Sequence, residues 1–233
     1  YTSAERRLAV LLNALAALLA VLALLILIAP YLFREALLFT AAPFWVTNTI
    51  AGLGLLAFLM WCAAADVRRF RPLIYIVVGG LAIGAVGCLL LLAQPHPDAQ
   101  TVPLLAGLVG CAAAAVLLVA ATLSAPEAAP RWSPWIPAKP LTGWEQGARV
   151  FFGLFGALSL GAALLSFALP SLLEPSAAAL AANPLFITGS SVKLGLLGLC
   201  ALPLAFDLRR CAHHLQLIIA LIVGNVISFI AIT

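Results

Sequence analysis

The sequence predicts an all-α protein, a polytopic transmembrane bundle of about seven helices built from two parallel three-helix repeats joined by a linker helix. Composition supports the membrane assignment. Hydrophobic residues make up 65% of the 233 positions and charged residues only 9%, which lies far outside the range of soluble domains. A water-soluble domain could not cover so many apolar side chains. The second observation is an apolar segment that occurs twice.

Residues 43–69 are repeated, without a gap, as residues 184–210. Both copies contain Gly-Leu-Leu, at 54–56 and 195–197, and both end in Asp-x-Arg-Arg. A constant offset of 141 residues indicates an internal duplication. Because both copies are mostly apolar, we expect the duplicated unit to lie in a bilayer.

Seven apolar stretches are long enough to cross a hydrocarbon core of ~30 Å, which needs about 20 helical residues. Helix is the expected conformation, because backbone polar groups find no water inside lipid and barrel strands would alternate in hydropathy. Prolines such as Pro103 are expected at helix ends, where a missing N–H costs little, whereas Pro203 should kink the sixth helix. The stretches are 8–28, 44–64, 73–93, 104–123, 150–169, 185–206 and 215–232.

The stretches divide the chain into a first repeat (1–98), a linker helix with a Pro/Trp-rich loop (99–147) and a second repeat (148–233). A single linker helix returns the chain to its starting side, so the two repeats are expected to be parallel. This 3+1+3 layout is similar to that of the SWEET sugar carriers in topology alone, since neither first helix carries their proline-glutamine motif. An alternative is four helices in each unit, with the eighth missing from this chain.

The distribution of positive charge predicts the orientation. Ten Lys and Arg residues fall on one side of the predicted bundle, and the other side holds only Arg34. The N-terminus is therefore expected on the cytoplasmic side, or on the stromal or matrix side of an organelle. With seven helices, the C-terminus lies opposite.

Lys193 is the strongest candidate for a binding residue. It follows Pro184 by nine residues, or ~13 Å of helix, and a lysine at membrane depth suggests a functional site. In one interpretation, Lys193 and nearby polar side chains line a cavity between the repeats for an anionic or carbonyl group; in the other, Lys193 extends to Glu174 or to headgroups and the hydroxyls bond backbone carbonyls. The polar side chains are Thr188, Ser190, Ser191, Thr47, Asn48 and Thr49.

The repeated Asp-x-Arg-Arg motifs are predicted to anchor the cytoplasmic ends of the second and sixth helices. Arginine there suits the negative helix C-terminus, anionic headgroups and the adjacent aspartate. The alternative is gating or lipid recognition, because a loosely similar acidic-basic loop occurs in major facilitator carriers; its fuller glycine-containing pattern is absent here. The residues are Asp66, Arg68, Arg69, Asp207, Arg209 and Arg210.

The hydrophilic segment from 124 to 147 carries three tryptophans, Trp132, Trp135 and Trp144. One interpretation is a linker on the membrane surface with its indole rings at headgroup level. The other is a docking surface for a partner subunit, since Trp and Arg anchors dominate interfaces.

Residues for catalysis, metal binding or nucleic-acid binding are not evident. The sequence has no paired carboxylates, no Ser-His-Asp set, no HExxH motif and no basic stripe with interleaved aromatics. One interpretation of His213 and His214 is contact with a pigment or quinone. An interfacial helix start explains them better, and two facing histidines for haem are missing.

The expected function is that of a non-catalytic accessory or scaffold subunit of a larger membrane complex, one of energy transduction for example. Bound lipid and neighbouring membrane subunits are the expected partners, and the cofactor is unknown. The alternative is a small-solute carrier with its polar site around Lys193. An enzyme acting on lipid or quinone is a third class, without a catalytic set to support it.

Overall fold

The computed structural model describes residues 2–32, 43–68, 70–94, 98–125, 142–169, 184–206 and 208, with 218, 219, 222, 223 and 226 near the end. Within these ranges the fold is all-α, as predicted, and no strand occurs. The helices are α1 (Ser3–Leu32), α2 (Pro43–Ala65), α3 (Arg71–Leu92), α4 (Asp98–Ser124), α5 (Gly143–Ala168) and α7 (Pro184–Phe206).

The six helices correspond to the first six apolar stretches of the sequence. Each is long and apolar enough to cross a membrane, which is compatible with a multi-pass membrane protein. The seventh predicted stretch, 215–232, lies mostly outside the described residues. The five positions described there, which include Ile218 and Val226, are helical.

All six helices begin before their apolar stretches, and α1, α4 and α5 do so by at least five residues. Local polar contacts explain the early starts of α1 and α5. In α1, the amide of Thr2 donates to Glu5 Oε2 at 2.7 Å and the amide of Glu5 donates to Thr2 Oγ1 at 3.2 Å. Thr142 and Glu145 form the same reciprocal pair before α5. Such capping boxes satisfy amides that the first helical turn leaves open.

The expectation that Pro103 marks a helix start is wrong. α4 begins at Asp98, so Pro103 lies inside the helix. Asp98 stands in the first turn, where a carboxylate complements the positive end of the helix dipole. At the sixth position of α4, proline removes one backbone hydrogen bond and its ring crowds the carbonyl four residues earlier, but the helix continues through it.

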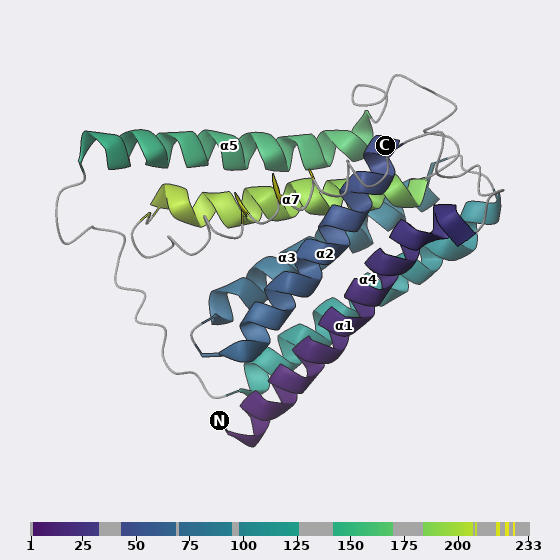
Figure 1. The fold of residues 1–233 in the computed structure, drawn as a ribbon, viewed down its shortest axis with the longest axis horizontal. Helices are drawn as coiled ribbons and strands as arrows, with labels where there is room; N and C mark the ends of the chain where they lie inside the picture. The colour runs from purple at the N-terminus through teal and green to yellow at the C-terminus, as the bar shows by residue number, and fades with distance from the viewer. Residues whose placement is uncertain are drawn as a thin grey trace.

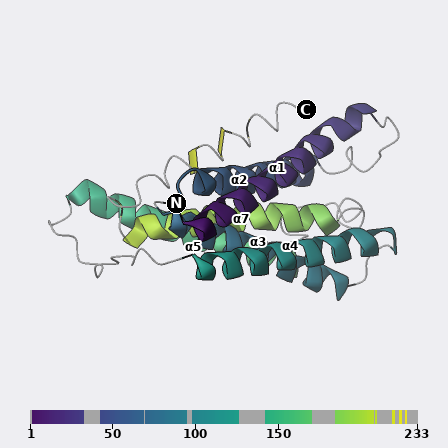
Figure 2. The same cartoon turned by 90° about the horizontal axis from the view of Figure 1, so that it is seen from below.

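The helices form a V (Figure 1). α1 to α4 make one arm and α5 with α7 makes the other, and the arms meet at one end, called here the joined end. There the side-chain amide of Gln94, after α3, donates to the carbonyl of Phe167 in α5 at 3.4 Å. Seen from below, α1 with α2 and α3 with α4 form two layers, and α7 lies between them (Figure 2).

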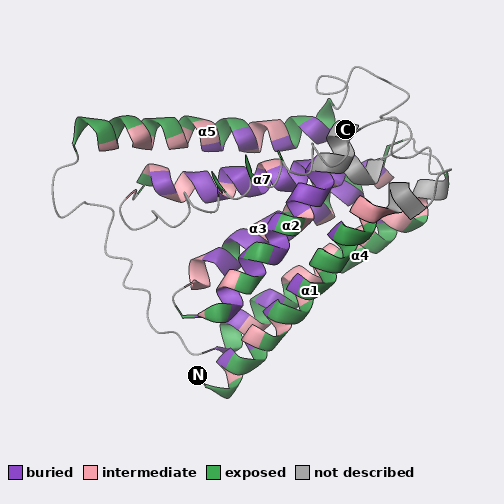
Figure 3. Ribbon diagram, in the orientation of Figure 1, coloured by how far each residue is buried: buried purple, intermediate pink, exposed green. Residues whose placement is uncertain are grey.

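The core follows the inner faces of α1, α2, α3 and α7. Leu8, Leu59, Met60, Ile74 and Leu204 are fully buried in one cluster. α2, α3 and α7 are buried on most sides, whereas α1, α4 and α5 expose long apolar faces (Figure 3). This division is expected for a bundle with central and lipid-facing helices.

α2 and α7 cross at two glycines that allow the backbones to approach closely. A Cβ on Gly52 would lie 3.0 Å from the carbonyl oxygen of Gly189 and 3.2 Å from Lys193 Cβ. A Cβ on Gly189 would lie 2.7 Å from Thr49 Cβ. Small residues at helix crossings are a main source of association in lipid, where water no longer drives apolar contact.

Gly189→Ala should therefore destabilise the protein. Thr49 Cβ is fixed to the backbone and cannot swing away, so the added methyl group should cost about 1–3 kcal/mol, as overpacking does in cores. The measurement is thermal unfolding in detergent. Gly54→Ala is the control, because Gly54 is exposed on α2 and its Cβ would meet nothing within 4 Å; an equal loss in both variants would contradict the close crossing.

Candidate functional site

Lys193 of α7 and Asn48 of α2 form a buried polar pair at the helix crossing. Only 6% of Lys193 and 4% of Asn48 is exposed. The Nζ ammonium of Lys193 donates a hydrogen bond to Asn48 Oδ1. The close approach of the two backbones at Gly52 brings these side chains together.

Hydroxyl-bearing residues close to this pair in the sequence are buried with it. Ser191 Oγ donates to the carbonyl of Ile187 in its own helix at 2.8 Å, and Cys88 Sγ of α3 lies 4.0 Å from Thr188 Oγ1 as a weak donor. Ser190 Oγ is buried, and no hydrogen-bond partner for it exists among the described residues. Thr49 is buried as well. The side chain of Thr47 lies outside the described residues.

The pair faces the helix interface rather than an open space. A cavity of about 550 Å³ lies beside it, and Thr49 and Thr188 line that cavity. Lys193 and Asn48 are not among the described residues on its wall. The hydrogen bond between this buried ammonium and the amide holds the two helices together. Breaking it would leave an unsatisfied polar group in a medium without water.

The first Asp-x-Arg-Arg motif takes part in a contact that the sequence did not suggest. Arg68 donates from Nε and from its second terminal nitrogen to the carboxylate of Glu5 in α1, at 2.6 and 3.0 Å. Glu5 is 3% exposed and Arg68 57%. A bidentate guanidinium–carboxylate pair fixes orientation as well as charge. The motif therefore ties the end of α2 to the start of α1.

Four members of the two motifs lie outside the described residues: Arg69, Asp207, Arg209 and Arg210. Asp66 accepts the amide of Phe70 with its backbone carbonyl at 2.9 Å, in the turn before α3. Anchoring of the helix ends, and gating or lipid recognition as its alternative, therefore stay predictions for both motifs.

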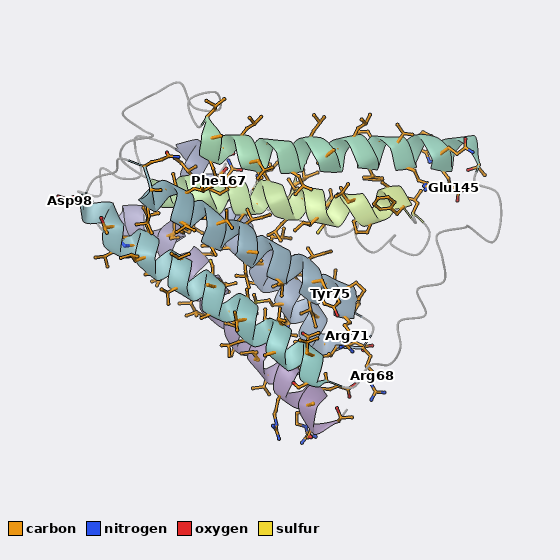
Figure 4. All side chains as sticks on the ribbon, turned by 180° about the vertical axis from the view of Figure 1, so that it is seen from behind. Arg68, Arg71, Tyr75, Asp98, Glu145 and Phe167 are labelled. Atoms are coloured by element: carbon orange, nitrogen blue, oxygen red, sulfur yellow. The ribbon has the colours of Figure 1, made fainter. Side chains whose placement is uncertain are left out.

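Two further arginines bind helix ends. Arg71 donates to the carbonyl of Thr122 at 2.8 Å, and Arg149 donates to the carbonyl of Ala205 at 2.7 Å. These carbonyls belong to the last turns of α4 and α7, which lack partners inside the helix. Arg68, Arg71 and Glu145 lie at the separated ends of the two arms, whereas Asp98 and Phe167 lie toward the joined end (Figure 4).

The other sequence candidates do not gather into a site in the described part of the chain. Trp144, at the start of α5, is 85% exposed, and Trp132, Trp135, His213 and His214 lie outside the described residues. Among the residues that the structure places, no three His, Cys, Asp or Glu side chains form a group able to hold a metal ion.

Comparison with protein-family models, curated proteins and solved structures finds no match to the chain. The interpretation of the Lys193–Asn48 pair and of the cavity beside it therefore depends on the residues and contacts of this chain alone.

Asn48→Leu should destabilise the protein by about 1–3 kcal/mol, because it leaves the Lys193 ammonium buried without its acceptor. The double variant Asn48→Leu, Lys193→Met should recover most of this loss, because both polar groups are then gone. A double-mutant cycle in thermal or denaturant unfolding measures the coupling. Additive effects of the two substitutions would contradict a direct pair.

Glu5→Gln should lower the midpoint of thermal unfolding, because the carboxylate that holds Arg68 loses its charge. In the presence of Arg68→Ala, the same substitution should have little effect, because the partner is absent. Arg6→Ala is a suitable control, since Arg6 is exposed in the same turn. A Glu5→Gln effect that persists without Arg68 would show that the ion pair is not its cause.

Proposed function

We propose that this protein is a non-catalytic accessory or scaffold subunit of a larger membrane assembly. The observation that carries the proposal is that the buried charge of Lys193 is bonded within the protein. Lys193 bonds Asn48 across the α2–α7 crossing, and no charged side chain is among the described residues that line the neighbouring cavity. A carrier for a polar solute would instead expose such a charge on the wall of the cavity.

The outward faces of α1, α4 and α5 support the same proposal. Val102, Leu123 and Leu158 are 73, 77 and 72% exposed. A Cβ at Gly147 or at Gly161 of α5 would meet nothing within 4 Å. Apolar faces with small residues allow another transmembrane helix to approach closely, and in lipid such contact replaces the hydrophobic effect.

We also propose the parallel duplication and the orientation that the sequence predicts. With the offset of 141 residues, Asn48 corresponds to Gly189 and Gly52 to Lys193. Exchange of the two repeats therefore converts the Asn48–Lys193 pair into the Gly189–Gly52 contact at the same crossing. Arg68 and Arg71 lie at the separated end of their arm (Figure 4), which would be the cytoplasmic side.

The alternative function is a small-solute carrier with a polar site around Lys193. One observation favours it: Ser190 Oγ is buried without a hydrogen-bond partner in the described part of the chain. A polar solute at the crossing would satisfy this hydroxyl. The two arms, which separate at one end, would then be the moving parts.

Purification of the full chain from its own membrane in mild detergent tests the proposal. We expect another integral membrane protein at fixed stoichiometry, and a Leu154→Ala, Leu158→Ala variant on the exposed face of α5 should lose it at least severalfold. Lys193→Met, Asn48→Leu should retain it. A chain that migrates alone, together with proteoliposome uptake that Lys193→Met abolishes, would establish the carrier instead.

A further inference from the structure

The cavity beside the crossing has no role in the proposed scaffold. Its volume is about 550 Å³, within the range of ~300–1,000 Å³ that small-molecule sites occupy. It lies between α1 and α4, and α2, α3 and α7 form its floor. In Figure 2 these helices form the two layers and the element between them.

The cavity is long and narrow. Its wall residues extend from Leu15 to Ile26 on α1, from Thr49 to Met60 on α2 and from Pro103 to Ala114 on α4. Each range covers roughly 16 Å at about 1.5 Å per residue. A volume of about 550 Å³ over this length leaves a mean cross-section of roughly 34 Å². Since carbon atoms pack about 3.5–4.0 Å apart, a space with this cross-section has room for one extended aliphatic chain.

The wall is mostly apolar, and its two hydroxyl groups lie at one end. It includes no charged and no aromatic side chain among the described residues. Thr49, Thr188 and Cys88 belong to the parts of α2, α7 and α3 at the joined end, and Leu15 and Met60 lie toward the other end. A phosphate group would therefore stay outside, and a quinone or pigment ring would find no aromatic face for stacking.

The cavity opens toward the bilayer beside α1. Leu18, Leu22 and Leu25 line it and are still 63, 43 and 56% exposed. On the floor, Met60 is fully buried and Cys88 is 1% exposed. An opening at this depth gives access to hydrocarbon rather than water, and the chains present there are those of membrane lipids.

We propose that this cavity binds one acyl chain of a phospholipid, which enters from the bilayer between α1 and α4. The ester end of the chain lies toward Thr49 and Thr188, and the chain end reaches Met60. The headgroup stays at the membrane surface.

Substitutions on one helix separate this site from general contact with lipid. Gly110 lines the cavity and a Cβ there would meet nothing within 4 Å, so Gly110→Phe should fill the space without a backbone clash. Val109, the next residue, is 64% exposed and is not on the cavity wall, so Val109→Phe is the matched control. Ala114→Leu, with Ala113→Leu as its control, is a second pair at the far end.

The probe is phosphatidylcholine with a photoreactive diazirine on one acyl chain, incorporated with the full-length protein into vesicles. In the unmodified protein we expect adducts on the buried wall residues Leu56 and Met60 of α2 and Leu81 and Cys88 of α3. Gly110→Phe should reduce these adducts at least fivefold and Val109→Phe should not. Labelling near Leu158, on the outward face of α5, should be equal in every variant.

Adducts confined to outward faces such as that of Leu158 would overturn the proposal. So would a stoichiometric isoprenoid compound, rather than phospholipid, in the organic extract of the purified protein. If Gly110→Phe does not fold, as judged by gel filtration and thermal unfolding, the comparison of Ala114→Leu with Ala113→Leu decides. Equal labelling in that pair would also refute the site.

Discussion

The crossing of α2 and α7 is the contact on which the other features of this fold depend. In lipid, apolar side chains gain little by leaving the solvent for one another, so close backbone approach and polar bonds decide which helices associate. Gly52 and Gly189 provide the first, and Lys193 with Asn48 provides the second. The same crossing unites the two arms of the V and forms part of the cavity floor.

Polar groups in this protein serve mainly to join helices. Glu5 and Arg68 join α1 to α2, Arg71 joins α3 to α4, and Arg149 joins α5 to α7. A carbonyl or carboxylate at a helix end has few other partners at the edge of a bilayer. This use of charge for assembly agrees with a scaffold better than with a solute pathway.

Much of this fold can be predicted from the sequence. The length of the apolar stretches locates the six described helices, and Thr188, Ser190 and Ser191 lie within five residues of Lys193. The sequence groups Asn48 with Lys193 through the repeat, but it could not show that the two side chains bond each other. Asn48 lies 145 residues from Lys193, and the choice between a cavity wall and a helix interface depends on side-chain direction. Glu5 was overlooked because it precedes the apolar stretch, although its spacing from Thr2 fits a capping box. The start of α4 was predicted too late because the residues around Pro103 look alike whether the proline lies before the helix or in its second turn.

The arginines at helix ends have two separate roles. Their charge directs insertion across the membrane, and their planar group bonds the end of a neighbouring helix. Replacement of Arg71 or Arg149 by lysine preserves the charge that directs insertion across the membrane. It removes the planar group with several fixed donors that reaches Thr122 or Ala205. Such a variant would insert into the membrane with the correct orientation, but its helices would pack less tightly. Insertion assays alone would therefore report it as normal.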